Sequence, residues 1–206
     1  MKRLALIGGG GHCKSCIEVI NSTSRFNIIG IFDKQEKKSE NYLGVPYLGD
    51  DSKISDTLSA NDMALITVGQ IHTSTIRKKL YELTKSMKIQ MPVVIASSSI
   101  VSHHSKILEG SIIMHGAIVN AAAKIGSNVI INSMALIEHD VQIGDHSHIS
   151  TGARINGNVH IAEGCFIGSG AIIHHGIQIG SNAVIGAGAV IDKDIASSSI
   201  VRGPNE

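Results

Sequence analysis

The sequence predicts an α/β, Rossmann-like N-terminal domain over residues 1–92, followed by a left-handed parallel β-helix of hexapeptide repeats over residues 93–206. Two observations support this fold class. A short apolar strand near the N-terminus runs into a glycine loop and then a helical stretch. Further on, a six-residue repeat continues without interruption from Ile95 to Ile191. The chain therefore combines two domains.

The repeat has three recurrent positions. Every sixth residue from Ile95 is Ile or Val, and the residue four places later is uncharged. The residue three places later is, in most repeats, a type that tolerates positive φ. We therefore expect chain corners at Gly110, Gly116, Asn128, Asp140, His146, Gly152, Asn158, Gly164, Gly170, Gly176, Asn182, Gly188 and Asp194.

A six-residue unit cannot bury its apolar residue alone, so the units must stack into a solenoid. We expect a triangular prism with three hexapeptides in each eighteen-residue coil and coils about 4.8 Å apart. The period of six does not reveal the handedness, so we take it from the known geometry of the left-handed form. Full burial of each Ile or Val contributes roughly 1.5–3 kcal/mol.

Composition narrows the range of partners. The 206-residue chain has 18 basic and 17 acidic residues and a net charge of +1, which argues against nucleic acid and favours small molecules. We expect a cytoplasmic protein without membrane insertion, because the sequence shows no signal peptide and no run of eighteen apolar residues. Three cysteines cannot build a disulfide framework, so we expect reduced thiols.

The N-terminal motif predicts a phosphate-binding turn. A strand over Leu4–Ile7 precedes the loop Gly8–His12 and a helix that extends to about Asn21. Free N–H groups at such a helix start favour an anion. A second strand over Ile28–Phe32 ends in Asp33, at the spacing of a dinucleotide fingerprint.

The fingerprint is incomplete, because Cys13 takes its third glycine position and the domain is too short for two mononucleotide halves. A single nucleotide, or half of one, fits better, and a glycine turn without a ligand is the alternative. Cys13 and Cys16 also form a CxxC pattern at the start of the predicted helix. Such a position can lower the pKa of a thiol, as in redox proteins, so a redox function is a further alternative.

The remaining N-terminal elements follow from local patterns. They are a loop or hairpin over Asn41–Asp50, a polar stretch to Asn61, a third strand over Met63–Val68, a helix over His72–Met87 and a lead into the first coil over Gln90–Val94. The helix is expected to bury Ile76, Leu80 and Leu83 on one face. The domain boundary is expected near Pro92.

Four segments carry a family resemblance. They are IGGGGHCK at Ile7–Lys14, IFDK at Ile31–Lys34, YLGVPYLGD at 42–50 and NSMALIEHDVQIGDHSHISTGARINGNVHI in the solenoid. The chain resembles, over its whole length, the hexapeptide-repeat nucleotide-sugar acetyltransferases: UDP-4-amino-sugar N-acetyltransferases and sialic acid O-acetyltransferases. IEHD at Ile137–Asp140, followed by HSHIS from His146, is the most specific segment.

The resemblance implies a homotrimer with acetyl-CoA in the groove between neighbouring prisms, and no metal. It implies that His139 is the general base and that Asp140 supports it, although the family often has Glu there. The implied acetyl-CoA residues are His148, Gly157, Ser169, Gly186, Ala187 and Gly188. The implied nucleotide-sugar residues are Gly8, Gly9, Gly10, Gly11, His12, Asp33, Lys34 and Gly69.

Some of these residues have a simpler interpretation. Asp140 falls at a corner, where Asp is a normal turn former. Other solenoid histidines are expected on solvated faces: His103, His104, His160, His174 and His175. The family's glycine-x-proline tail continues further than the Arg202–Pro204 segment here, so a cofactor contact from this tail stays open.

The expected function is acetyl-CoA-dependent N-acetylation of a UDP-4-amino-4,6-dideoxy sugar in surface polysaccharide or glycan biosynthesis. Two alternatives stay open: a sialic acid O-acetyltransferase and a noncatalytic module that binds a nucleotide sugar. A zinc hydratase on the same fold would need a histidine pair five residues apart, and the sequence contains none.

Stacking arithmetic predicts space around His139. At eighteen residues per coil, its column reads His103, Ala121, His139, Gly157 and His175. We expect a notch in which a thioester and a sugar can approach, because both neighbours of His139 are small. Gly157 precedes the corner, so its φ is not expected to be positive.

Overall fold

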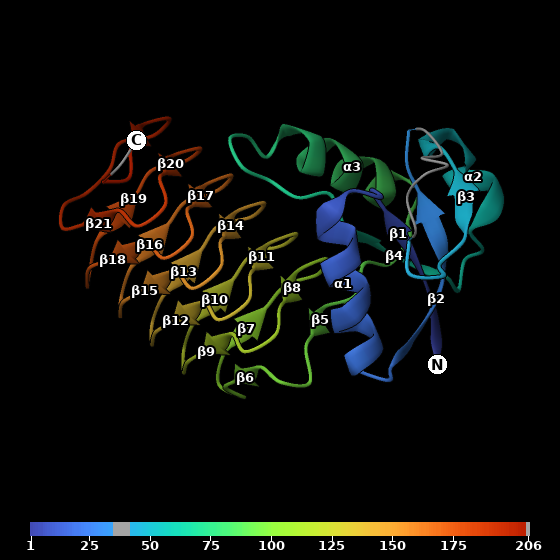
Figure 1. Cartoon of the computed structure of the whole chain (residues 1–206), viewed down its shortest axis with the longest axis horizontal. Coiled ribbons are helices and arrows are strands. Elements are labelled where there is room, and N and C mark those ends of the chain that lie inside the picture. Colours follow the sequence, from blue (N-terminus) through green and yellow to red (C-terminus); the bar gives the residue numbers. More distant parts are fainter. Residues whose placement is uncertain (35–41, 205–206) are drawn as a thin grey trace. The chain divides into compact units, whose positions relative to one another are not determined.

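A computed structural model of the protein describes residues 1–34 and 42–204, which form two compact units (Figure 1). The first unit contains Met1–Gly69 and Ile76–Pro92, and the second contains Gln70–Thr75 and Val93–Glu206. The segment Gln70–Thr75 thus belongs with the solenoid, although elements of the first unit flank it. None of the helices described is long and apolar enough to cross a membrane.

The first unit is built on a parallel sheet with strand order β3-β2-β1-β4. Its strands are β1 (Lys2–Ile7), β2 (Phe26–Phe32), β3 (Tyr47–Gly49) and β4 (Met63–Ile66). Its helices are α1 (Gly11–Ser22), the 3₁₀ turn η1 (Asp51–Lys53), α2 (Ile54–Thr57) and α3 (Thr75–Ser86). The run Leu4–Ile7 in β1 is fully buried, as expected for an inner parallel strand.

The hairpin alternative for residues 41–50 is wrong. Tyr47–Gly49 forms β3, which pairs in parallel with β2 at Ile31 and Phe32. A strand of three residues is too short to show a period of two, so its pattern gave no signal. Asn41 lies outside the described residues.

The buried face of α3 differs from the expected one. Ile76 is 52% exposed, and the buried positions are Arg77, Leu80, Tyr81 and Thr84. Arg77 donates to the carbonyl oxygens of Ile66, the last residue of β4, at 3.2 Å and of Val68, just beyond the strand, at 2.6 Å. Desolvation lowers the pKa of Arg77 to about 10. Hydropathy could not predict a buried guanidinium.

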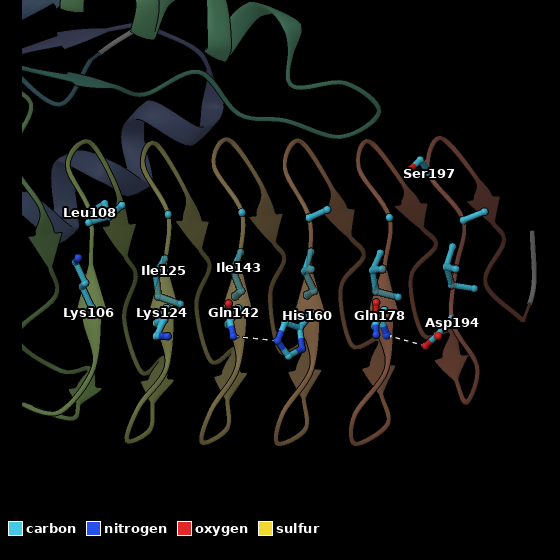
Figure 2. A pocket seen from close by; sticks show the side chains of 18 residues that line it. Lys106, Leu108, Lys124, Ile125, Gln142, Ile143, His160, Gln178, Asp194 and Ser197 are labelled. Atoms are coloured by element: carbon cyan, nitrogen blue, oxygen red, sulfur yellow. Dashed lines mark hydrogen bonds between the residues drawn. The ribbon is translucent and has the colours of Figure 1, made fainter.

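The second unit is a left-handed β-helix with three parallel faces, each named here after one strand. The β14 face contains β5 (Val94–Ile95), β8 (Ile112–Ile113), β11 (Ile130–Ile131), β14 (His148–Ile149), β17 (Phe166–Ile167), β20 (Val184–Ile185) and β22 (Ile200–Val201). The β12 face contains β6 (Ile100–Val101), β9 (Ile118–Val119), β12 (Leu136–Ile137), β15 (Arg154–Ile155), β18 (Ile172–Ile173) and β21 (Val190–Ile191). The β13 face contains β7 (Lys106–Ile107), β10 (Lys124–Ile125), β13 (Gln142–Ile143), β16 (His160–Ile161) and β19 (Gln178–Ile179), and Figure 2 shows it from close by.

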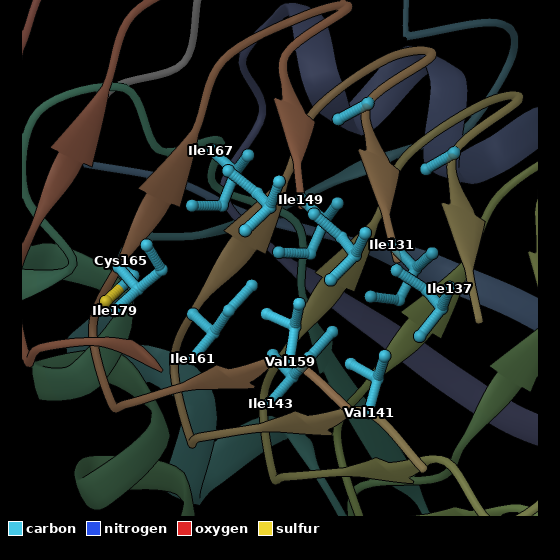
Figure 3. Packing of buried hydrophobic residues seen from close by; sticks show 14 of the residues in the cluster. Ile131, Ile137, Val141, Ile143, Ile149, Val159, Ile161, Cys165, Ile167 and Ile179 are labelled. Carbon is cyan, nitrogen blue, oxygen red and sulfur yellow. The ribbon is translucent and has the colours of Figure 1, made fainter. Parts of the chain in front are cut away.

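The register confirms eighteen residues per coil. Ile137 pairs with Ile155, and Ile143 with Ile161. Inside the prism, the repeating Ile and Val pack against small residues such as Ala117, Ala153 and Cys165, all with no exposed surface (Figure 3). The two inward positions of each hexapeptide therefore build one continuous core.

The predicted corners adopt the left-handed conformation, with one exception. Asp194 has no positive φ, because the last coil is irregular: its carboxylate accepts from Gln178 N at 2.8 Å, and Ile195 forms an isolated bridge with Ile179. Two corners that composition did not mark, Ala122 and Met134, have φ values of 61° and 59°. Stacking imposes the turn there on residues that disfavour it.

Candidate active site

His139 and Asp140 lie where the chain turns from the β12 face to the β13 face, and we call this line of corners the β12/β13 edge. Asp140 takes the corner conformation, with φ at 60°. Its Oδ2 lies 2.8 Å from His139 Nδ1, and both side chains are 58% exposed. The carboxylate accepts the bond, so Nδ1 carries the proton and Nε2 is free to act as an acceptor.

Gly157 stacks directly on His139. Asn158 N donates to His139 O at 3.0 Å, and Asp140 N donates to Ala121 O at 3.1 Å, which confirms the predicted column. Gly157 is not in the left-handed region, also as predicted. A Cβ on Gly157 would lie 2.7 Å from His139 Cε1 and 2.8 Å from Nε2, closer than real Cβ contacts. The glycine thus makes room for the imidazole of His139 itself.

Four other residues implied for acetyl-CoA lie on a different line of corners, between the β14 and β12 faces, which we call the β14/β12 edge. Ser169 and Ala187 are one coil apart there, and Gly188 N donates to Ser169 O at 2.9 Å. Gly186 and Gly188 flank Ala187 in the same turn. In one chain, these residues and Gly157 therefore border opposite sides of the β12 face.

The C-terminal tail covers part of this turn. A Cβ on Gly203 would overlap the carbonyl oxygen of Ala187, and Pro204 lies within van der Waals distance of the position that a Cβ on Gly188 would take. The short tail thus packs against two of the residues implied for acetyl-CoA.

His148 lies within the β14 face and is only 6% exposed. Its Nδ1 pairs with the carbonyl oxygen of Gln70 at 2.8 Å, and its Nε2 pairs with Asn132 Nδ2 at 3.1 Å. The ring also contacts Phe166 edge-on, with centroids 5.3 Å apart. In the single chain, His148 therefore anchors the segment that begins at Gln70.

Gln70 strengthens this anchor. Its side-chain amide donates to the carbonyl oxygens of Gly164 at 3.3 Å and Cys165 at 3.2 Å, and the residue is 3% exposed. The sequence analysis missed the roles of Gln70 and Asn132. The pairing of Gln70 with His148 joins positions 78 residues apart, so no local pattern could predict it.

The residues implied for the nucleotide sugar meet at the carboxyl ends of β1, β2 and β4. Gly8–His12 follows β1, Asp33 follows β2, and Gly69 lies beyond β4. Asp33 accepts from Gly9 N at 3.0 Å and from Lys34 N at 2.7 Å. In open parallel sheets, ligands bind beyond the carboxyl ends of the strands.

The glycines of this loop serve different purposes. A Cβ on Gly9 would lie 2.8 Å from Tyr42 Cε1 and 3.0 Å from Asp33 Oδ2, so side chains pack against it. Among the described residues, a Cβ on Gly10 or Gly11 would meet nothing within 4 Å. Gly10 caps α1 without a side-chain hydrogen bond. The start of α1 therefore faces open space, which suits an anion.

The cysteines do not resemble a redox pair. Cys13 and Cys16 are fully buried, and desolvation raises the pKa of the Cys13 thiol to about 11 and that of Cys16 further still. Burial also raises the pKa of Cys165 to about 11. A reactive CxxC needs a lowered pKa, so this alternative is wrong.

A groove of about 870 Å³ runs along the β13 face (Figure 2). Its polar lining includes Lys106, Lys124, Gln142 and His160, and Gln142 Nε2 pairs with His160 Nε2 at 2.9 Å. None of the predicted site residues lines it. Within residues 1–34 and 42–204, no three His, Cys, Asp or Glu side chains are grouped as a metal site would need.

Comparisons with known proteins match both units. The model of the PglD N-terminal domain matches residues 3–83, and the model of the bacterial transferase hexapeptide (six repeats) matches residues 122–157 and 158–193. UDP-N-acetylbacillosamine N-acetyltransferase of Bacillus subtilis (strain 168) is 36% identical over 118 residues, which cover 55% of this chain. That match spans only 52% of the relative's own length.

Solved structures match almost the whole chain. The acetyltransferase domain of PglB from Neisseria gonorrhoeae FA1090, in complex with acetyl coenzyme A, is 32% identical with a TM-score of 0.90 and covers 98% of this chain and 96% of that one. A histidine-to-alanine mutant of GDP-perosamine N-acetyltransferase from Caulobacter crescentus, in complex with CoA and GDP-perosamine, is 29% identical with a TM-score of 0.88. It covers 97% of this chain and 93% of that one. The resemblance noted in the sequence is confirmed: the chain belongs to the hexapeptide-repeat nucleotide-sugar acetyltransferase family.

Proposed function

We propose that the protein transfers the acetyl group of acetyl-CoA to the amino group of a UDP-4-amino-4,6-dideoxy sugar. The observation that carries this proposal is the His139–Asp140 pair, whose Nδ1–Oδ2 distance is 2.8 Å and which stands exposed beside Gly157. Two relatives support an amino-sugar acceptor, the UDP-N-acetylbacillosamine N-acetyltransferase of Bacillus subtilis and the GDP-perosamine N-acetyltransferase of Caulobacter crescentus.

His139 acts as general base in this proposal. The acceptor nitrogen attacks the thioester carbonyl, and His139 Nε2 takes a proton from it as the C–N bond forms. The C–S bond then breaks, and the proton passes to the departing thiolate. Asp140 holds the imidazole in the tautomer that leaves Nε2 basic and stabilises the imidazolium.

The backbone around the notch offers a donor for the oxyanion. Gly157 N has no hydrogen-bond acceptor among the described residues, while Gly157 O accepts from Gly176 N at 3.0 Å. A free N–H beside the base can stabilise the negative charge that develops on the thioester oxygen. We assign this role to Gly157, in addition to making room for His139.

We further propose that the active protein is a homotrimer with acetyl-CoA bound between prisms. Outward positions of the β12 face are apolar apart from Arg154: Ile100, Ile118, Leu136, Ile172 and Val190. Ile100 is 66% exposed and Val190 57%. An exposed, largely apolar face of this kind marks a protein interface. A second copy packed on the β12 face would bring residues of the β12/β13 edge of one copy close to residues of the β14/β12 edge of the other. We propose that acetyl-CoA binds in the groove between them, with His148 at its border.

On the acceptor side, we propose that the loop Gly8–His12, Asp33, Lys34 and Gly69 binds the nucleotide sugar. The uncapped start of α1 suits the diphosphate, and Asp33 suits a ribose hydroxyl. Because Asp33 also accepts from Gly9 N, it couples the two parts of this site.

The test is direct. Purified protein and acetyl-CoA are incubated separately with a UDP-4-amino sugar, CMP-sialic acid and free sialic acid, and thiol release is followed. Mass spectrometry then identifies the product. We expect an acetamide on the UDP sugar. An acetyl ester on a sialic acid would identify an O-acetyltransferase, and UDP-sugar binding without thiol release would identify a noncatalytic module.

A further inference from the structure

A second imidazole borders the space in front of Gly157. The point where a Cβ on Gly157 would lie is 2.8 Å from His139 Nε2 and 3.3 Å from His175 Nδ1. Gly176 N donates to Gly157 O at 3.0 Å, which places His175 in the same column, one coil further on. The two rings therefore lean over the same glycine from neighbouring coils.

The ring of His175 is available for a ligand. Its side chain is exposed, and within the described part of the chain no hydrogen bond involves its ring. Some other solenoid histidines differ in this respect, since His115 pairs with Ser98, and His160 with Gln142. His175 thus presents Nδ1 to the gap without a competing contact.

The chemistry of an amine makes use of two acceptors. A primary amine has one lone pair and two N–H groups. In acyl transfer the lone pair forms the new C–N bond, and one proton goes to His139 Nε2. The second N–H stays on the product amide. His175 Nδ1 can accept it when the His175 proton is on Nε2. A hydroxyl acceptor has one O–H group and can use only His139.

We propose that His175 is a substrate-positioning residue that accepts the second N–H of the acceptor amine and so favours N-acetyl over O-acetyl transfer. This inference rests on the proposed function. Its step is balanced: the C–N bond forms, the C–S bond breaks, and the proton taken by His139 goes to the thiolate. The other N–H stays on nitrogen, hydrogen-bonded to His175.

The experiment compares three variants with wild type. His175→Ala removes the acceptor, while His175→Asn keeps an oxygen near the position of Nδ1. His174→Ala is the matched control, because His174 is the exposed neighbour outside the column. Each protein receives acetyl-CoA with a UDP-4-amino sugar or with the corresponding UDP sugar that has a hydroxyl on that carbon. The values of kcat and KM come from thiol release, and melting temperatures report the fold.

We expect His175→Ala to lower kcat/KM for the amine about three- to tenfold, the range of one hydrogen bond. Transfer to the hydroxyl analogue should not fall, so the amine preference decreases. His175→Asn should restore most of the loss, and His174→Ala should match wild type. If wild type does not acetylate the hydroxyl analogue measurably, the loss for the amine and its rescue by Asn decide the question.

The inference is overturned if His175→Ala acetylates the amine as wild type does, or if Asn rescues nothing. A failure of the proposed function looks different. In that case wild type releases no thiol with either acceptor, or His139→Ala releases it as fast as wild type. An active wild type with an inactive His139→Ala and an unaffected His175→Ala would reject only the inference.

Discussion

At the scale of single residues, His139 depends on two neighbours of opposite kind. Asp140 adds a charge that fixes the tautomer, and Gly157 leaves out a side chain that would displace the ring. The shorter Asp reaches Nδ1 directly, because its corner φ of 60° brings the carboxylate beside the imidazole. The proposed role of His139 as general base can therefore be tested by changing either neighbour.

We expect His139→Ala to lower kcat by about 10²- to 10⁴-fold, the usual contribution of a general base. The fold should not change, because the side chain is 58% exposed and its column contains Ala in the preceding coil. Thiol-release kinetics and melting temperature test both parts. Activity within about tenfold of wild type would reject His139 as the base.

We expect Gly157→Val to reduce turnover strongly while the coil still folds. A Cβ there would lie 2.8 Å from His139 Nε2, so the imidazole must move away from its position. Gly157 is not in the left-handed region, so a β-branched residue suits its backbone. Kinetics and size-exclusion chromatography distinguish the outcomes. Aggregation would mean that the backbone requires glycine, and normal turnover would mean that the notch is irrelevant.

The buried thiols predict a loss of stability in alkali. Burial raises the pKa of Cys165 from 9.0 to about 11, so between these values the unfolded state loses its proton first. The free energy of unfolding should therefore fall above pH 9, by about 1.4 kcal/mol per pH unit for this thiol. Urea unfolding at pH 8, 9 and 10 measures the slope. Cys165→Ala, which matches the Ala at equivalent core positions, should have a shallower one, and equal slopes would contradict the prediction.

At the scale of elements, the loop after β1 and the end of β2 form one unit, because Asp33 accepts from Gly9 N and Lys34 N. We expect Asp33→Ala to weaken UDP binding at least about tenfold, since it removes a ribose acceptor and loosens the loop. Isothermal titration with UDP measures the affinity. Asp56→Ala, on the exposed side of α2, is the control, and equal affinities for both variants would reject the site.

An element could be predicted from the sequence when its residue type recurs at the same position of many repeats. The inward Ile and Val recur in every hexapeptide, so their burial was predictable from the period alone. Corners depend on single residues. Met134 has a positive φ between Gly116 and Gly152 of the neighbouring coils, and Ala122 precedes Asp140, which has the same conformation one coil further on. The first unit has no sequence repeat. Neither the strand β3 nor the burial of Arg77 could therefore be predicted from residues at equivalent positions.

At the scale of the whole molecule, the apolar β12 face predicts the assembly. We expect Leu136→Asp to dissociate the trimer, because it buries a charge in the proposed interface. Lys124→Asp also introduces an Asp, but on the polar β13 face, and should leave the trimer intact. Light scattering coupled to size-exclusion chromatography gives the mass of each. Monomeric wild type, or equal masses for the two variants, would refute the assembly.

The stacking of coils decides which parts of the candidate site could be predicted from the sequence. Column arithmetic predicted that His139 lies next to Gly157, because stacking converts a spacing of eighteen residues into a contact. The anchor between His148 and Gln70 could not be predicted, because Gln70 lies outside the repeat and its position depends on tertiary packing. Most of the residues proposed for acetyl-CoA lie on two edges of one prism, and their spacing does not show which copies would meet.

The eighteen-residue register also governs how the length of such a chain can change in evolution. Loss of one complete coil of eighteen residues would return every later side chain to its former column. Loss of six residues between Asp140 and Asn156 would keep Ile and Val inside, but it would turn all later residues by one face. Glu163 would then lie where Gly157 now faces His139. Such a protein could keep its core and lose its chemistry, so insertions and deletions compatible with activity are expected in whole coils.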